Sequence, residues 1–170
     1  EEHFGFVPAT DRMLFDYEEM INYFVKLDKA SAMVKLVENG ISPMGKKMYI
    51  VFISSATNIR DLDKLREINR ELALNPALSE AKQAEYIRDG RVFFLATLSI
   101  HSTEVAPAQA APLIAYKLIT SENPQVTKYL DDVVYMMIPN QNPDGMDLVV
   151  ENYKKYKDTK YEGASLPGVY

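Results

Sequence analysis

The sequence predicts an α/β fold with a mixed, largely parallel sheet flanked by helices. Three segments, 48–53, 91–100 and 132–139, are apolar on both faces, as expected of strands buried between helical layers. Segments with helical spacing of apolar residues separate them, and this alternation is typical of α/β folds. Ligands bind such sheets beyond the carboxyl ends of the strands, so the residues that follow the strands are the first candidates for a site.

Periodicity and local signals predict the remaining elements. Apolar residues at helical spacing predict a helix from Asp16, its N-cap, to about Lys29. Residues 32–38 are predicted to form a strand that ends at the turn signal Asn39-Gly40. Further helices are predicted over 58–74, 79–88, 103–120, 124–130 and 146–156, and a loop that ends in "GASLPGVY" follows Asp158.

Composition limits the classes of function. The chain has 170 residues, enough for one domain over 1–170, and no repeat or linker divides it. A net charge of −5 and a pI near 5.1 argue against nucleic-acid binding, and no apolar run approaches the roughly 20 residues of a membrane span. The absence of cysteine excludes disulfides and thiolate metal sites. The start at Glu1, without methionine or a signal-like segment, is interpreted as a trimmed or mature start.

Two side chains able to bind a metal follow the most apolar strand. His101 and Glu104 lie three residues apart where this strand gives way to a helix. Imidazole nitrogen and carboxylate oxygen are both zinc ligands, and a catalytic zinc site has three protein ligands and an open position for water. Alternatively, Glu104 only favours a helix N-terminus through the dipole, and His101 is a polar strand end.

A second polar segment, "NQNPDG", follows the strand 132–139. Taken by itself, the segment Asn142–Gly145 is a turn, with Pro143 presetting φ and Gly145 at the fourth position. No Gly-x-Ser-x-Gly elbow surrounds the serines, which argues against a serine hydrolase. The sheet rule therefore places His101 and the loop with Asn142, Asp144 and Gly145 just past the ends of central strands.

Taken together, these motifs resemble the zinc carboxypeptidase family, the carboxypeptidase A-like metallopeptidases. The resemblance is carried by "SIHSTE", by "IPNQNPDG" about forty residues later, and by "GISPMGKKMYIVFISS" (40–55), similar to the family's G-x-S-x-x-G turn before a long strand. It implies a zinc-dependent exopeptidase acting on peptides, with His101 and Glu104 as two ligands of one Zn²⁺. It also implies a secreted or periplasmic protein, with Asn142, Asp144 and Gly145 near the substrate.

The sequence departs from the family pattern downstream. No histidine follows His101 and no arginine follows Arg91, so the family's third ligand, its substrate-binding arginine and its transition-state arginine have no counterpart. The family's general base also lies further downstream, and no catalytic base is assigned within this chain. Thr103 stands where some digestive members have arginine, so their substrate preference does not carry over.

We therefore interpret the chain as the truncated N-terminal half of a metallopeptidase domain, inactive alone. Two ligands bind zinc weakly, and half a sheet exposes a strand edge, so we expect self-association or a partner at that edge. The sequence also allows two other interpretations of the function. One is a related zinc deacylase of N-acyl amino acids, and the other is a non-catalytic binding module on the same fold.

Overall fold

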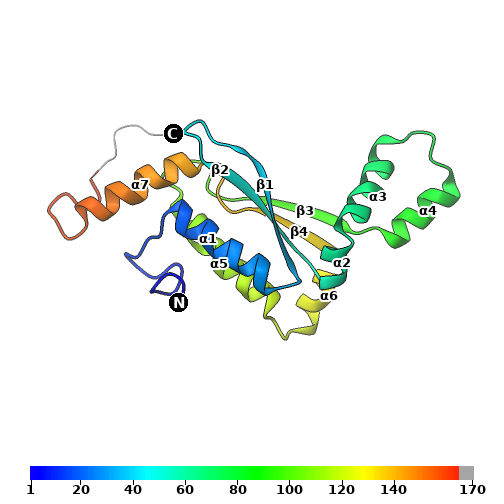
Figure 1. The fold of residues 1–170 in the computed structure, drawn as a ribbon, viewed down its shortest axis with the longest axis horizontal. Helices are drawn as coiled ribbons and strands as arrows, with labels where there is room; N and C mark the ends of the chain where they lie inside the picture. Colours follow the sequence, from blue (N-terminus) through cyan, green and yellow to red (C-terminus); the bar gives the residue numbers. More distant parts are fainter. Residues whose placement is uncertain (165–170) are drawn as a thin grey trace.

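The computed structural model describes residues 1–164 as a mixed α/β arrangement around one sheet (Figure 1). The predicted "GASLPGVY" end falls largely outside the described residues. The elements in chain order are α1 (Tyr17–Ala30), β1 (Val34–Ile41), β2 (Lys47–Ile53), α2 (Ala56–Arg60), α3 (Leu62–Leu74), α4 (Glu80–Asp89), β3 (Val92–Thr97), α5 (Val105–Ile119), α6 (Pro124–Asp132), β4 (Val133–Ile138) and α7 (Pro143–Tyr156).

The α/β class and the mixed sheet are confirmed. The strand order is β1-β2-β4-β3, with β3 parallel to β4 and β2 antiparallel to both β1 and β4. Parallel pairing is thus less frequent among these strands than in the largely parallel sheet that the sequence predicts. The reason is the short connection between β1 and β2, which forms a hairpin and so requires antiparallel pairing.

The turn between β1 and β2 lies later than predicted. Asn39-Gly40 does not end the strand, because β1 continues to Ile41 with a register shift between Glu38 and Gly40. The reversal follows at Ser42–Lys46, closed by a 2.8 Å hydrogen bond from the Ser42 N–H to the Lys46 carbonyl. Gly45, with φ of +86°, takes the left-handed conformation there, which glycine adopts without strain.

Helices α1 and α5 lie side by side against the sheet (Figure 1). Helix α1 begins as predicted at Asp16, whose side chain accepts the Glu19 N–H while the Glu19 side chain accepts the Asp16 N–H. The core of this layer is formed by buried apolar side chains of α1, α5, α7 and the strands. They include Met20, Phe24, Val51, Ile53, Ala108, Ala111, Met137 and Val150.

A smaller apolar cluster lies on the other face of the sheet, where Phe52 and Val134 pack with Leu62 and Leu65 of α3. The predicted single helix over 58–74 is two helices, because the chain leaves helical geometry at Asp61. Helices α3 and α4 extend away from the sheet (Figure 1). Among residues 1–164, no helix has the length and apolar composition needed to cross a membrane.

Candidate functional site

His101 and Glu104 form a tight turn between the end of β3 and the start of α5. The Glu104 carboxylate accepts the backbone N–H of His101 at 3.0 Å, and its other oxygen lies 2.9 Å from the His101 Nδ1. The Glu104 N–H donates in turn to the His101 carbonyl at 3.0 Å. The two side chains are 63% and 48% exposed, so both are accessible from solvent. The hydrogen bond from the His101 side chain lowers the pKa of Glu104.

Hydrogen bonds from both neighbouring strands fix this turn. Leu98 donates to the Ile138 carbonyl at 3.0 Å, and Gln141 donates to the Leu98 carbonyl at 2.8 Å, so the ladder between β3 and β4 continues past both strands. Ser99 has φ of +52°, and its hydroxyl donates to the Glu104 carbonyl and accepts the Ala108 N–H. The histidine and the glutamate are thus attached to the carboxyl end of β3.

The segment Asn142–Gly145 is the start of α7 and not a separate loop or turn. The Asn142 side chain caps the helix by accepting the Gly145 N–H at 2.9 Å, and Pro143 occupies the first turn. Turn and helix signals coincide here, because asparagine favours N-caps and proline favours the first helical position. The sequence interpretation of this segment as a turn ahead of a helix from residue 146 was therefore wrong.

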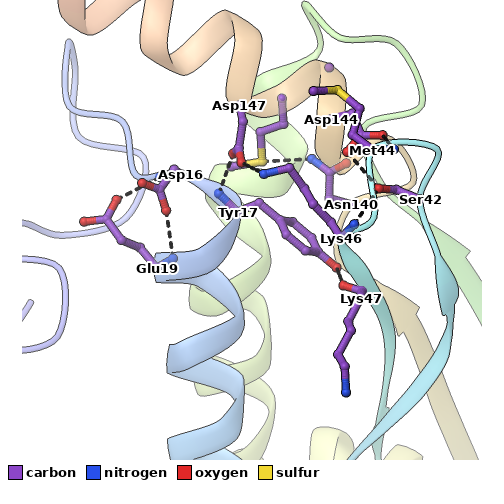
Figure 2. Close-up of polar contacts among 12 residues, drawn as sticks. Asp16, Tyr17, Glu19, Ser42, Met44, Lys46, Lys47, Asn140, Asp144 and Asp147 are labelled. Carbon is purple, nitrogen blue, oxygen red and sulfur yellow. Dashed lines mark hydrogen bonds and ion pairs between the residues drawn. The ribbon is translucent and has the colours of Figure 1, made fainter.

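Asp144 anchors the β1–β2 hairpin to α7. Its carboxylate is buried and accepts the Ser42 hydroxyl at 2.8 Å and the Met44 N–H at 3.1 Å (Figure 2). Of the three residues predicted near the substrate, Asp144 therefore has its carboxylate turned toward the hairpin.

The two predicted motifs meet at Ser102. This serine, 2% exposed, lies between His101 and Glu104 in the chain. The Asn142 side-chain amide donates to its hydroxyl at 3.4 Å, and Gly145 lies against it so closely that an added Cβ would fall 2.1 Å from the Ser102 Oγ. The structure thus brings the His101–Glu104 turn and the first turn of α7 together.

Several residues of this region were missed by the sequence analysis. Asp147 accepts the Tyr17 N–H at 2.8 Å and pairs with Lys46, so it connects α1, α7 and the hairpin (Figure 2). Asn140 is 1% exposed and accepts the Asn142 N–H at 2.7 Å. The Gln141 Oε1 is a buried acceptor with no hydrogen-bond partner among the described residues. The spacing of Asp144 and Asp147, one helical turn apart, could have indicated that both side chains face the same neighbouring element.

The His101–Glu104 pair offers an imidazole nitrogen and a carboxylate oxygen, which are both suitable zinc ligands. The 2.9 Å between Nδ1 and Oε1 is close to the roughly 3.3 Å that separates two ligands of a tetrahedral zinc ion. No group of three or more His, Cys, Asp or Glu side chains able to hold a metal occurs in the part of the chain that the structure describes. The other histidine, His3, is engaged elsewhere, with its ring nitrogens 3.0 Å from the Glu19 carbonyl and from the Lys26 Nζ.

Solved carboxypeptidase structures share this fold. Carboxypeptidase A from Helicoverpa armigera matches with a TM-score of 0.54 and 19% identity, over 83% of this chain and 27% of its own length. Thrombin-activatable fibrinolysis inhibitor matches with a TM-score of 0.61 and 11% identity, over 99% and 36%. The bovine form of that protein, in complex with tick carboxypeptidase inhibitor, matches with 0.51 and 12%, over 93% and 41%. This chain thus spans about a quarter to two fifths of the length of these proteins.

Sequence comparison identifies the family. A search of the curated proteins finds no match. The family model described as zinc carboxypeptidase, however, matches residues 20–166, which include both motifs and the β1–β2 hairpin. The expected resemblance is thereby confirmed over most of the chain, and the likeness to solved structures agrees with it in fold. The chain belongs to the zinc carboxypeptidase family.

Proposed function

We propose that His101 and Glu104 are two of the three protein ligands of the zinc ion in a zinc-dependent exopeptidase. The observation that carries the proposal is the exposed, preformed pair at the carboxyl end of β3, with Nδ1 2.9 Å from the Glu104 carboxylate. Family membership supplies the expected metal and reaction class. A bound zinc ion would activate a water molecule and polarise the peptide carbonyl.

The protonation of the pair fits this role. A carboxylate only accepts hydrogen bonds, so the contact between Nδ1 and Oε1 places the imidazole proton on Nδ1 in the metal-free protein. As a zinc ligand through Nδ1, His101 would carry the proton of its neutral ring on Nε2. Glu104 orients the ring in the metal-free protein and would supply an oxygen ligand to the metal.

We propose that the first turn of α7 forms the wall beside the metal. Asn142 and Gly145 contact Ser102 directly, and Asp144 holds the turn against the hairpin. In this role Asn142, Asp144 and Gly145 shape the space for a peptide substrate near the pair.

We further propose that this chain, as the N-terminal half of a peptidase domain, does not hydrolyse peptides alone. The third ligand, the general base and the group that binds the terminal carboxylate would come from residues outside the described part. The family relationship also favours a secreted or periplasmic protein.

Peptide hydrolysis tests the proposal. A longer natural polypeptide that contains this chain should release carboxyl-terminal amino acids from peptides, as followed by mass spectrometry. Chelation and His101→Ala should each abolish the release, while His3→Ala should leave it unchanged. Purified 170-residue chain with zinc should release nothing. Release that survives His101→Ala would overturn the assignment, and complete inactivity of every longer polypeptide would support a binding module instead.

A further inference from the structure

Gly145 lies in a gap with no room for a side chain. A Cβ at this position would lie 2.1 Å from the Ser102 Oγ, 2.8 Å from the Ser102 Cβ and 2.7 Å from the Asn142 Nδ2. Real Cβ atoms essentially never come so close to other heavy atoms. The glycine is needed here for the close approach of α7 to the turn and not for an unusual φ angle, since it lies within the helix.

The residue against which Gly145 packs, Ser102, belongs to the candidate metal site. Ser102 follows His101 directly, precedes Glu104 by two residues and is 2% exposed. His101 and Glu104 are themselves exposed, so neither side chain is held by surrounding core residues. Ser102 is therefore the buried residue through which the four-residue turn His101–Glu104 packs against α7.

We propose that the contact between Gly145 and Ser102 positions His101 and Glu104 relative to each other. Any side chain at residue 145 would push Ser102, and with it the backbone that carries both groups, away from α7. This inference deepens the proposed function, because the positioned pair is the one assigned to zinc. It makes Gly145 and Ser102 positioning residues, which act on the pair through the backbone.

The chain offers a matched control for a purely structural effect. A Cβ at Gly90 would lie 2.6 Å from the Tyr86 carbonyl oxygen and 3.0 Å from the Ile68 Cγ2, so Gly90→Ala also creates a clash. That clash lies at the end of α4, where Gly90 caps the helix. Gly40→Ala is a neutral control, because a Cβ there meets nothing within 4 Å.

NMR of the imidazole rings reports the geometry of the His101–Glu104 pair in the metal-free protein. The chain has two histidines, so ¹⁵N-labelled protein gives two sets of ring signals, assigned with His3→Ala. At alkaline pH, where imidazoles are neutral, His101 should show the tautomer protonated on Nδ1. Gly145→Ala should lose this signature for His101 and keep the His3 signals. Gly90→Ala should destabilise the protein yet leave His101 unchanged, as should Gly40→Ala.

A second substitution separates the contact from general damage. Ser102→Gly removes both the Oγ and the Cβ that the new methyl group would meet, whereas Ser102→Ala leaves the Cβ at 2.8 Å. Gly145→Ala combined with Ser102→Gly should therefore recover the Nδ1–H signature, and the combination with Ser102→Ala should not. The recovery will be partial, because the Asn142 amide must still move.

Zinc titration of the same variants separates this inference from the proposed function. Gly145→Ala should weaken zinc binding by about 10–100-fold, with recovery on adding Ser102→Gly. An unchanged His101 signature in Gly145→Ala, or equal recovery by both serine substitutions, would overturn the positioning contact. A signature that responds as predicted in a protein whose zinc binding does not depend on His101 would instead uphold the contact and refute the metal assignment.

Discussion

Asp147 accepts the backbone N–H of Tyr17 at 2.8 Å, although the two residues are 130 positions apart in the sequence (Figure 2). This hydrogen bond joins the first residue of α1 to the second turn of α7. The same carboxylate pairs with Lys46 in the hairpin loop. This ion pair and the hydrogen bonds from Ser42 and Met44 to Asp144 hold the hairpin loop against α7. The first turn of the same helix contacts Ser102.

Removing the Asp147 carboxylate should destabilise the fold. Asp147→Ala leaves the Tyr17 N–H without its partner and Lys46 without its counter-charge, so the free energy of unfolding should fall by about 2 kcal/mol. Asp147→Asn keeps an acceptor for Tyr17 and should cost less. Urea unfolding measures both, with the exposed Glu151→Ala as the control, expected within about 0.5 kcal/mol of the parent chain. Equal losses in Asp147→Ala and Glu151→Ala would show that the connection contributes nothing.

Stability should decline at alkaline pH. Burial raises the pKa of the Tyr17 phenol above its ordinary value, and the hydrogen bond to Asp147 raises the pKa of Lys46. The folded state therefore holds both protons more tightly than the unfolded chain. The resulting stabilisation is complete below about pH 10 and is lost as the pH rises through the folded-state pKa values.

Tyr17→Phe isolates the phenol contribution. The variant loses the hydrogen bond from the hydroxyl to the Lys47 carbonyl, so it should be about 1 kcal/mol less stable at pH 7. Its unfolding free energy should then fall less steeply between pH 9 and 11 than that of the parent chain. Urea unfolding over that range checks the slope, and a steeper fall in Tyr17→Phe would contradict the assignment.

The free edge of β3 should cause self-association of the purified chain. Among the described strands β3 pairs with β4 alone, and its Val92, Phe94 and Leu95 are 64%, 56% and 50% exposed. An unpaired, apolar edge without charges favours pairing with another chain. Light scattering should show a mass above 19.3 kDa. Leu95→Lys should shift the population to monomer, whereas Ile87→Lys on α4 should not. A monodisperse monomer of the parent chain would refute this expectation.

The sequence predicts the elements better than it predicts their connections. Asp16 and the apolar periodicity after it identify α1 correctly, because the capping box and the buried stripe are both local properties. Asn39-Gly40 is equally suited to a turn and to a bulge, and its neighbours in the sheet decide between them. The break at Asp61 likewise carries no proline or glycine signal, and depends on how α3 packs on the sheet.

In the candidate site, too, the local contact was predictable from the sequence and the long-range contacts were not. The contact between His101 and Glu104 was predictable, since both groups lie within one turn and follow a recognisable strand. The contact between Gly145 and Ser102 was not, because it joins segments about forty residues apart through the absence of a side chain. The partners of Asp144 and Asp147 lie about a hundred residues or more away, so only the folded structure shows them.

Zinc calorimetry on the chain and its His101→Ala variant, in chelator-cleared buffer, shows whether His101 is a ligand of the metal. We expect weak, one-site binding by the parent chain, absent from His101→Ala and retained by His3→Ala. Tight binding that is lost in His101→Ala would keep His101 as a ligand but show that a third ligand is present after all. Zinc binding of the same strength in the parent chain and in His101→Ala would contradict the assignment of this pair to the metal.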